Sequence, residues 1–189
     1  MSVIYLQEVA SWQAIGPDDF PHHVVISAPV SSVDAGIRLR CECVILLPKH
    51  MQTAIRTRHH STNYIAVQIH DMLFVNVYIP QSGQPLESYL QSIREVESFL
   101  TSLRSAEVPP QHICLGGDFN VSLPPRQGDV TGPFAMLRPQ TQARVTAMLE
   151  FLTRWQLRAL NTWEPLDAAR RNGQLTTWRG SARRQKNEN

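Results

Sequence analysis

The sequence predicts a layered α/β or α+β domain, on three observations. Short apolar segments typical of β-strands recur along the first two thirds of the chain. Two longer segments repeat their apolar residues with the period of an α-helix and lie between groups of strands. The 189 residues are 42% hydrophobic and 18% charged, a composition that excludes a collagen, a long coiled coil and a disordered chain.

The first strands are predicted near the N-terminus. Residues 2–9 form a compact apolar run that ends in Gln-Glu, as expected of a buried strand. Residues 10–35 are rich in Pro, Asp, His and Ser, which predicts a loop with one short strand around 23–27. Residues 36–47 begin with strict alternation, become continuously apolar and stop at a proline, which predicts a third strand.

Neither the cysteines nor the histidine pairs have the spacing of a zinc site. Cys41 and Cys43 alternate on one face of the third strand, and we expect them to be small core residues. The histidine pairs at 59–60 and 22–23 lie in polar stretches, which predicts solvated loops. Three cysteines cannot build a disulfide framework, so a reducing, intracellular compartment is expected.

The middle of the chain predicts a hairpin followed by a helix. Residues 64–70 and 73–79 are two strands separated by a very short turn, which is typical of an antiparallel hairpin. Residues 86–104 carry apolar side chains at helical spacing. The expected buried stripe consists of Leu86, Leu90, Ile93, Phe99, Leu100 and Leu103, with Val96 beside it.

The last third of the chain predicts further elements and a tail. These are a buried strand at 112–116, an irregular loop at 121–140, an amphipathic helix at 141–157, and short strands at 157–163 and 174–178. The inward residues of that helix are expected to be Val145, Met148, Leu149 and Leu152. We therefore expect one partial domain over 1–178 and a disordered basic tail over 179–189.

Polar residues end three of the predicted strands. Glu8 closes the first apolar strand, and Asn76 and Tyr78 interrupt the second strand of the hairpin. Asp118 and Asn120 follow directly on the next buried strand. Carboxylate and amide groups are costly to bury unless they are paired or bound to a metal. These five residues are therefore the candidate functional site.

Four short motifs occur in an order that resembles a known family. They are LQEV at 6–9, NVYIP at 76–80, LGGDFN at 115–120 and TTW at 176–178. In this order and with this spacing between the motifs, the chain resembles the endonuclease/exonuclease/phosphatase family. Within that family it resembles the apurinic-endonuclease-like endonuclease domains of non-LTR retrotransposons. The resemblance implies a four-layer α/β sandwich of the deoxyribonuclease I-like fold, and a metal-dependent phosphodiesterase.

The resemblance also implies a role for each candidate residue. Glu8 would match the family's metal ligand, and a carboxylate oxygen suits Mg²⁺ or Mn²⁺. Asp118 would match the aspartate that orients or deprotonates the attacking water, and Asn120 the amide that contacts the phosphate and fixes that aspartate. Tyr78 would match a phenol that faces the scissile phosphate. A metal and a base are what phosphodiester cleavage requires.

Contacts to DNA are expected towards the C-terminus. Thr177 and Trp178 fall where related endonucleases place residues near the DNA, and Asn76 is included with them, although we expect it mainly to support the site from behind. The charge balance is −4 over 1–137 and +6 over 138–189. The basic residues Arg170, Arg171, Arg179, Arg183, Arg184 and Lys186 either contact DNA phosphates or form a solvated tail, and both interpretations stay open.

The chain departs from the family pattern at both ends. Residues 1–7 contain no asparagine, although the family begins with a strand whose Asn helps to hold the metal. No histidine follows His112, although the family ends with an Asp-bearing strand and a Ser-Asp-His segment whose His is catalytic. We therefore expect a domain without the N-terminal strand and the C-terminal strands, in which catalysis is impaired because such groups act as a unit.

Three functional hypotheses follow. The first is a DNA endonuclease of retrotransposon type within a larger polyprotein that carries a reverse transcriptase; the resemblance implies a nuclear site of action. The second is a phosphatase of the same fold that acts on a small phosphoester or a phosphoinositide. The third is a non-catalytic remnant, which the missing family residues favour. No apolar run reaches the ~18 residues of a transmembrane helix and the N-terminus lacks the basic flank of a signal peptide, so neither a membrane partner nor secretion is expected.

Overall fold

The computed structural model describes residues 3–9, 20–27, 41–81, 83–133, 135 and 142–160. At positions 8, 9, 41 and 42 the description covers the backbone alone. The chain divides into two compact units, Met1–Val121 (unit 1) and Ser122–Asn189 (unit 2), and each is described by itself. No helix among the described residues is long and apolar enough to cross a membrane.

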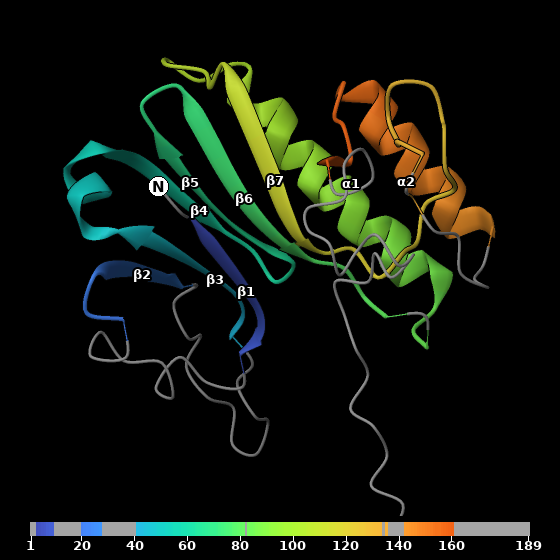
Figure 1. Ribbon diagram of the computed structural model, residues 1–189, viewed down its shortest axis with the longest axis horizontal. Coiled ribbons are helices and arrows are strands. Elements are labelled where there is room, and N and C mark those ends of the chain that lie inside the picture. Colours follow the sequence, from blue (N-terminus) through green and yellow to red (C-terminus); the bar gives the residue numbers. More distant parts are fainter. Residues whose placement is uncertain are drawn as a thin grey trace, which may run out of the picture. The chain divides into compact units, whose positions relative to one another are not determined.

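Unit 1 contains two β-sheets (Figure 1). The three-stranded sheet is antiparallel and has the strand order β1-β3-β2. Its strands are β1 (Ile4–Val9), β2 (His23–Ser27) and β3 (Cys41–Pro48). The four-stranded sheet has the order β4-β5-β6-β7, in which β7 is parallel to β6 and the other neighbours are antiparallel. Its strands are β4 (Ile55–His60), β5 (Tyr64–Ile69), β6 (Met72–Tyr78) and β7 (His112–Asp118).

The two sheets pack face to face around one apolar core. Alternate residues of β3 and β5 point into it, because successive side chains of a strand face opposite sides of its sheet. The buried core residues are Ile26, Cys43, Ile45, Leu47, Met51, Ile65, Val67, Ile69, Phe74 and Tyr78. Val44 and Leu46 of β3 belong to a second cluster with Ile4 and Leu6. β3 is therefore buried on both faces, which explains its continuous apolar sequence and confirms Cys43 as a core residue.

Helix α1 (Leu86–Leu103) contributes to a third layer, on the other face of the four-stranded sheet (Figure 1). The ring of Phe99 stacks on Tyr64 with a centroid distance of 4.7 Å and contacts the His59 ring at 5.0 Å. The predicted helix is confirmed, but its stripe differs at the start. Leu86 is 36% exposed, whereas Tyr89 is fully buried. Tyr89 replaces Leu86 because its larger ring removes more apolar area from water.

The predicted α/β class is confirmed, since unit 1 packs two sheets and a helix in layers. The described residues of unit 1 contain three of the four layers expected. The predicted hairpin is confirmed as the antiparallel pair β5–β6. The short strand predicted around 23–27 is confirmed as β2.

One strand of the four-stranded sheet departs from the prediction. β4, together with the 3-10 helix η2 (Lys49–Ala54) before it, occupies a segment for which no element is predicted. The histidine pair 59–60 lies in β4, so its prediction as a solvated loop is wrong. Among the described residues β4 pairs with β5 alone, and most of its side chains are exposed, which hides the strand from an apolar pattern.

Unit 2 is described through helix α2 (Gln142–Arg154) and the loop before it. The buried face of α2 consists of Arg144, Val145, Met148, Phe151 and Leu152; Leu149 is only half-buried, contrary to the prediction. In the loop, the buried Thr131 hydroxyl donates to the Pro124 carbonyl at 2.7 Å, which holds an irregular segment as expected. The described part of the predicted strand 157–163 contains an isolated bridge at Ala159, and the strand predicted at 174–178 lies outside the described residues.

Candidate active site

The ends of β6 and β7 bring two of the predicted residues together. Tyr78 and Asp118 are direct partners in the parallel register of these strands. The backbone N–H of Ile79 donates to the Asp118 carbonyl at 2.9 Å, which continues the ladder past Tyr78. Tyr78 is 8% exposed and Asp118 is half-buried. A tyrosine and an aspartate are therefore neighbours on adjacent strands, where both strands end.

Asn120 fixes the Asp118 side chain and is itself fixed to β6. Its backbone N–H donates to Asp118 Oδ1 at 2.9 Å, and its side-chain Nδ2 donates to the Ile79 carbonyl at 2.8 Å. Asn120 has a φ of 46°, a left-handed conformation that asparagine tolerates better than most residues. The second carboxylate oxygen of Asp118 has no hydrogen-bond partner among the described residues. That oxygen is available to a ligand.

Two glycines allow β7 to approach its neighbours before Asp118. A Cβ on Gly116 would lie 2.6 Å from ring atoms of Tyr5, and a Cβ on Gly117 would lie 1.9 Å from the Val77 carbonyl oxygen. Gly117 also has a φ of 131°. The Gly-Gly pair of the LGGDFN motif is thus required by close packing, a role that the motif by itself does not predict.

β1 follows the same direction along β6 and β7. The Tyr5 hydroxyl donates to the Cys114 carbonyl at 3.1 Å, and Gln7 Nε2 donates to Asn76 Oδ1 at 2.7 Å. Burial, followed by that hydrogen bond, raises the pKa of the Tyr5 phenol well above its usual range, so the phenol stays protonated. These contacts bring the C-terminal end of β1, where the backbone of Glu8 lies, to the same end of the sandwich as the candidate residues of β6 and β7.

Asn76 holds this arrangement from behind. Its side chain is 0% exposed, and Nδ2 donates to the carbonyls of Leu6 at 2.8 Å and Val44 at 2.9 Å. With the bond from Gln7, one amide connects β1 and β3 of one sheet to β6 of the other. Asn76 has no exposed surface with which to contact DNA, so the structure corrects its inclusion with Thr177 and Trp178 and supports the structural role.

The donors at this site are hard oxygens. Among the described residues no group of three or more His, Cys, Asp and Glu side chains gathers as a metal cage would require. Asp118 supplies one carboxylate, and Glu8 is placed by its strand near the same end. Mg²⁺ is commonly held by one or two carboxylates with waters completing its octahedron, so this donor set fits a magnesium site in its chemistry. Thr177, Trp178 and the basic cluster of the tail lie outside the described residues.

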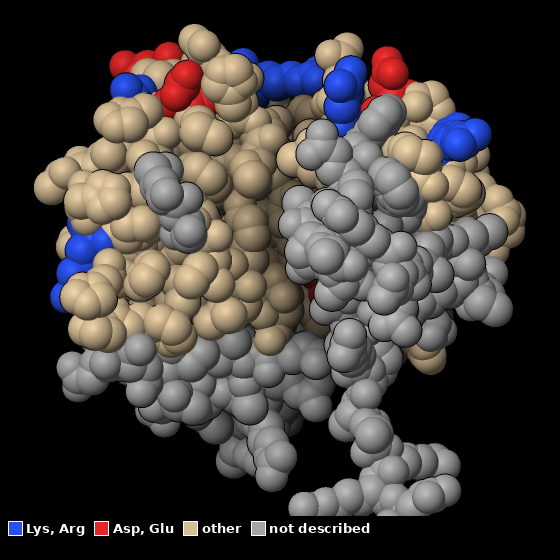
Figure 2. Space-filling view, viewed as in Figure 1, with Lys and Arg blue, Asp and Glu red and all other residues tan. Residues whose placement is uncertain are grey.

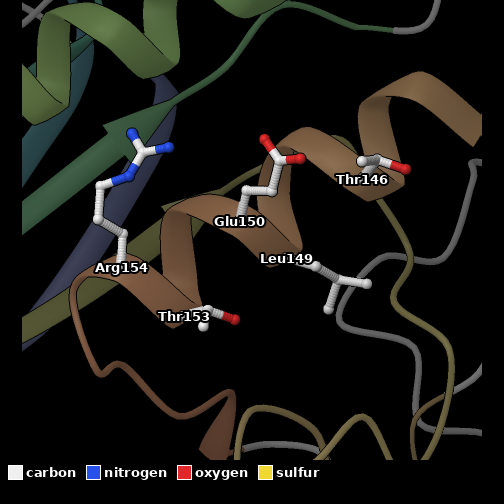
Figure 3. Close-up of a pocket in the computed structure, with 5 residues that line it drawn as sticks. All are labelled: Thr146, Leu149, Glu150, Thr153 and Arg154. Carbon is white, nitrogen blue, oxygen red and sulfur yellow. The ribbon is translucent and has the colours of Figure 1, made fainter.

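A separate hollow of about 440 Å³ lies along α2 (Figure 3). Its described lining is Thr146, Leu149, Glu150, Thr153 and Arg154, all from one helix. None of the predicted site residues whose side chains the structure describes lines it, and side chains from a single helix do not converge on a ligand as those of an active site do. The hollow therefore supports no functional assignment.

Figure 2 shows no single basic patch among the described residues on the face that it draws. Acidic and basic residues lie next to each other at the rim, and the middle of this face is uncharged. This description covers the residues that the structure describes. A surface for DNA phosphates is therefore not evident on this face from charge alone.

Solved structures resemble the fold of this chain. A 3′ phosphatase, NExo, from Neisseria, bound to a product DNA hairpin, has a TM-score of 0.53 and is 14% identical, over 80% of this chain and 60% of that chain. The chain has the deoxyribonuclease I-like fold. This confirms the fold expected from the motif order. At 14% identity the similarity shows the fold and says nothing about the activity. The chain spans about 60% of the length of that deoxyribonuclease I-like structure.

Other comparisons add little to the deoxyribonuclease I-like assignment. An AP endonuclease from Archaeoglobus fulgidus is 17% identical, with a TM-score of 0.48 over 80% of this chain and 60% of that chain. Its TM-score is too low to support an argument. No protein-family model matches the sequence, and no curated protein matches it. The site geometry, rather than a sequence relative, therefore has to support a function.

Proposed function

We propose that this chain is a metal-dependent phosphoesterase that hydrolyses phosphodiester bonds in DNA, of the kind found in the endonuclease domains of non-LTR retrotransposons. The observation that carries the proposal is the pairing of Tyr78 with Asp118 at adjacent strand ends, with Asn120 bonded to the carboxylate. The deoxyribonuclease I-like fold supports the proposal, because the motif order that predicts this fold also predicts these three residues as its site.

The proposed roles follow from the contacts. Asp118 Oδ1 is held by Asn120, so the other oxygen can orient a water and accept its proton as a general base. The Tyr78 hydroxyl, which accepts a bond from Gln81 Nε2 at 3.3 Å, can donate its proton to a phosphate oxygen. Glu8 would hold Mg²⁺ or Mn²⁺, which would stabilise negative charge on the phosphate.

The proposal extends to partners and location. Thr177, Trp178 and the basic residues of the tail are proposed contacts to DNA, since arginines neutralise phosphates without reading the sequence. A nuclear, intracellular site of action and a polyprotein partner with reverse transcriptase activity belong to the same hypothesis. No membrane partner is proposed.

Nicking of supercoiled plasmid tests the proposal. We expect relaxation of the plasmid with Mg²⁺ and none with EDTA. Asp118→Ala should lower the rate by about 100-fold or more, because it removes the general base. Asp71→Ala is the matched control, since Asp71 is an exposed carboxylate in the β5–β6 turn. Equal nicking by wild type and Asp118→Ala would overturn the role of Asp118.

A second candidate is a phosphomonoesterase that acts at a DNA 3′ end. The similarity to the Neisseria 3′ phosphatase favours it. An oligonucleotide with a 3′ phosphate distinguishes the two, because only the phosphatase releases inorganic phosphate from it. A small phosphoester or phosphoinositide substrate can be compared in the same assay.

The third possibility is a folded remnant without activity. A cooperative thermal transition without hydrolysis of any of these substrates would support the remnant and contradict the enzyme.

A further inference from the structure

A carboxylate on α1 binds the turn that joins β4 to β5. Glu95 Oε1 accepts a hydrogen bond from the Ser61 hydroxyl, and Oε2 accepts one from Asn63 Nδ2 at 2.6 Å. All three side chains are half-buried. The turn is also closed by its own backbone, where Ser61 N–H donates to the Tyr64 carbonyl at 2.8 Å. One side chain of the helix therefore holds both sides of a tight turn.

The same turn holds the backbone of Tyr78. The Asn63 carbonyl accepts the Tyr78 N–H at 2.8 Å, which is the last rung between β5 and β6. On its other side, the segment after Tyr78 is bonded to Asp118 and Asn120. Tyr78 is thus fixed from two sides, by the candidate site on β7 and by the turn that Glu95 binds.

The chemistry of the contact specifies donors and acceptors. An ionised carboxylate only accepts hydrogen bonds, so both partners on the turn must be donors, as Ser61 and Asn63 are. Burial and then the nearby Glu95 carboxylate raise the pKa of the Tyr64 phenol, which is the direction expected of a negative charge beside that ring. Bonds to a charged group are stronger than neutral ones, so this contact restrains the turn more than an ordinary turn contact would.

We propose that Glu95 is a positioning residue, which acts through Asn63 to hold Tyr78 in the candidate site. The effect on catalysis rests on the proposed function, whereas the effect on Tyr78 does not. Glu95 has no direct bond to Tyr78, Asp118 or Asn120 among the described residues, so its influence passes through the turn.

The donor–acceptor pattern allows a reciprocal swap. Asn63→Asp places two carboxylates together and loses the bond. Glu95→Gln keeps only a neutral bond, because the Gln oxygen can accept from Asn63 Nδ2 while its amide nitrogen donates to the Ser61 hydroxyl. The double variant Glu95→Gln with Asn63→Asp restores a bond to a carboxylate with reversed polarity, while the Gln oxygen still accepts from Ser61. Glu87→Gln is the control, because this carboxylate is exposed on the same helix and, among the described residues, bonds to Arg94 alone.

Kinetics give the first readout. We expect Asn63→Asp to lower kcat by about tenfold and Glu95→Gln to lower it less, both with little change in KM, because the reacting groups are displaced while substrate contacts remain. The double variant should recover most of the loss. Unchanged kcat in both single variants, or a loss that the double variant deepens, would overturn the proposal. Melting curves measured by circular dichroism test whether each variant folds. If a single variant does not fold, Ser61→Ala is used in its place, because it removes only one of the two bonds to Glu95.

Fluorine NMR gives a readout that needs no activity. The chain has four tyrosines, so labelling with 3-fluorotyrosine gives a spectrum in which Tyr78→Phe assigns the Tyr78 signal. We expect that signal to move in both single variants and to return in the double variant. Movement of the Tyr64 signal with a fixed Tyr78 signal would overturn the positioning role, because the substitution would be sensed only next to Glu95. A further outcome is that the wild type hydrolyses no substrate while the Tyr78 signal still moves in the single variants. In that case the proposed function fails and the positioning role stands.

Discussion

Gly117 is a residue whose replacement the backbone does not tolerate. Its φ of 131° is rarely adopted by L-residues, and a Cβ would lie 1.9 Å from the Val77 carbonyl oxygen. We predict that Gly117→Ala lowers the free energy of unfolding by about 2 kcal/mol or more, measured by urea denaturation. Gly83→Ala is the control, since nothing lies within 4 Å of its Cβ, and it should change that free energy by less than about 0.5 kcal/mol. Equal effects would contradict the strain.

His59 makes stability depend on pH. Burial, and secondarily the charge of His60, lowers the pKa of His59 below 6.5, and its Nε2 is buried without a hydrogen-bond partner among the described residues. The unfolded chain therefore binds the proton more readily than the folded chain. The stability that neutral His59 contributes is present above about pH 6.5 and is lost as the pH falls below it.

Urea unfolding across this pH range measures the His59 effect. We predict that the free energy of unfolding falls between about pH 7.5 and pH 5.5, and that His59→Phe makes the fall smaller. His22→Gln, at an exposed position, serves as the control. An unchanged pH dependence in His59→Phe would show that other groups cause it.

At the scale of elements, Asn76 connects three strands. Its replacement by Leu would leave the Leu6 and Val44 carbonyls and the Gln7 amide without their partner in a buried place. We predict a loss of about 3 kcal/mol or more in the free energy of unfolding, because each orphaned buried group costs about 1–3 kcal/mol. Gln91→Leu on the exposed face of α1 should change it by under about 0.5 kcal/mol. A loss of similar size in both variants would argue against the connection.

The elements also show what the sequence can predict. The β5–β6 hairpin and α1 are predicted because their residues contact neighbours at short sequence separation and carry a clear period. β4 is not predicted, because most of this edge strand is exposed. It carries Arg and His at positions where a recognisable strand pattern would have apolar residues. Tyr78, Asp118 and Asn120 are predicted from their motifs. Glu95 is not, because its contact with Asn63 joins residues 32 positions apart and leaves no local signal.

At the scale of the whole molecule, metal binding should be visible as stability. A ligand that binds only the folded state stabilises it by about 2.7 kcal/mol at a concentration of 100 times Kd. We predict that Mg²⁺ raises the Tm in a thermal melt, that EDTA reverses the shift, that Glu8→Gln removes it, and that Asp118→Asn weakens it by removing a nearby negative charge. Ca²⁺ and Mn²⁺ can be compared in the same way. A shift that persists in both variants would place the metal elsewhere.

Tyr78 and Asp118 form the last residue pair of the β6–β7 ladder, and this position affects the order in which the protein unfolds. Ladders open from their ends at a lower free energy than they dissolve in the middle. Mild denaturant would therefore loosen this last rung, and with it the spacing of the two residues, before the middle of the ladder opens. A largely folded spectrum would then accompany a protein whose site geometry is already disturbed.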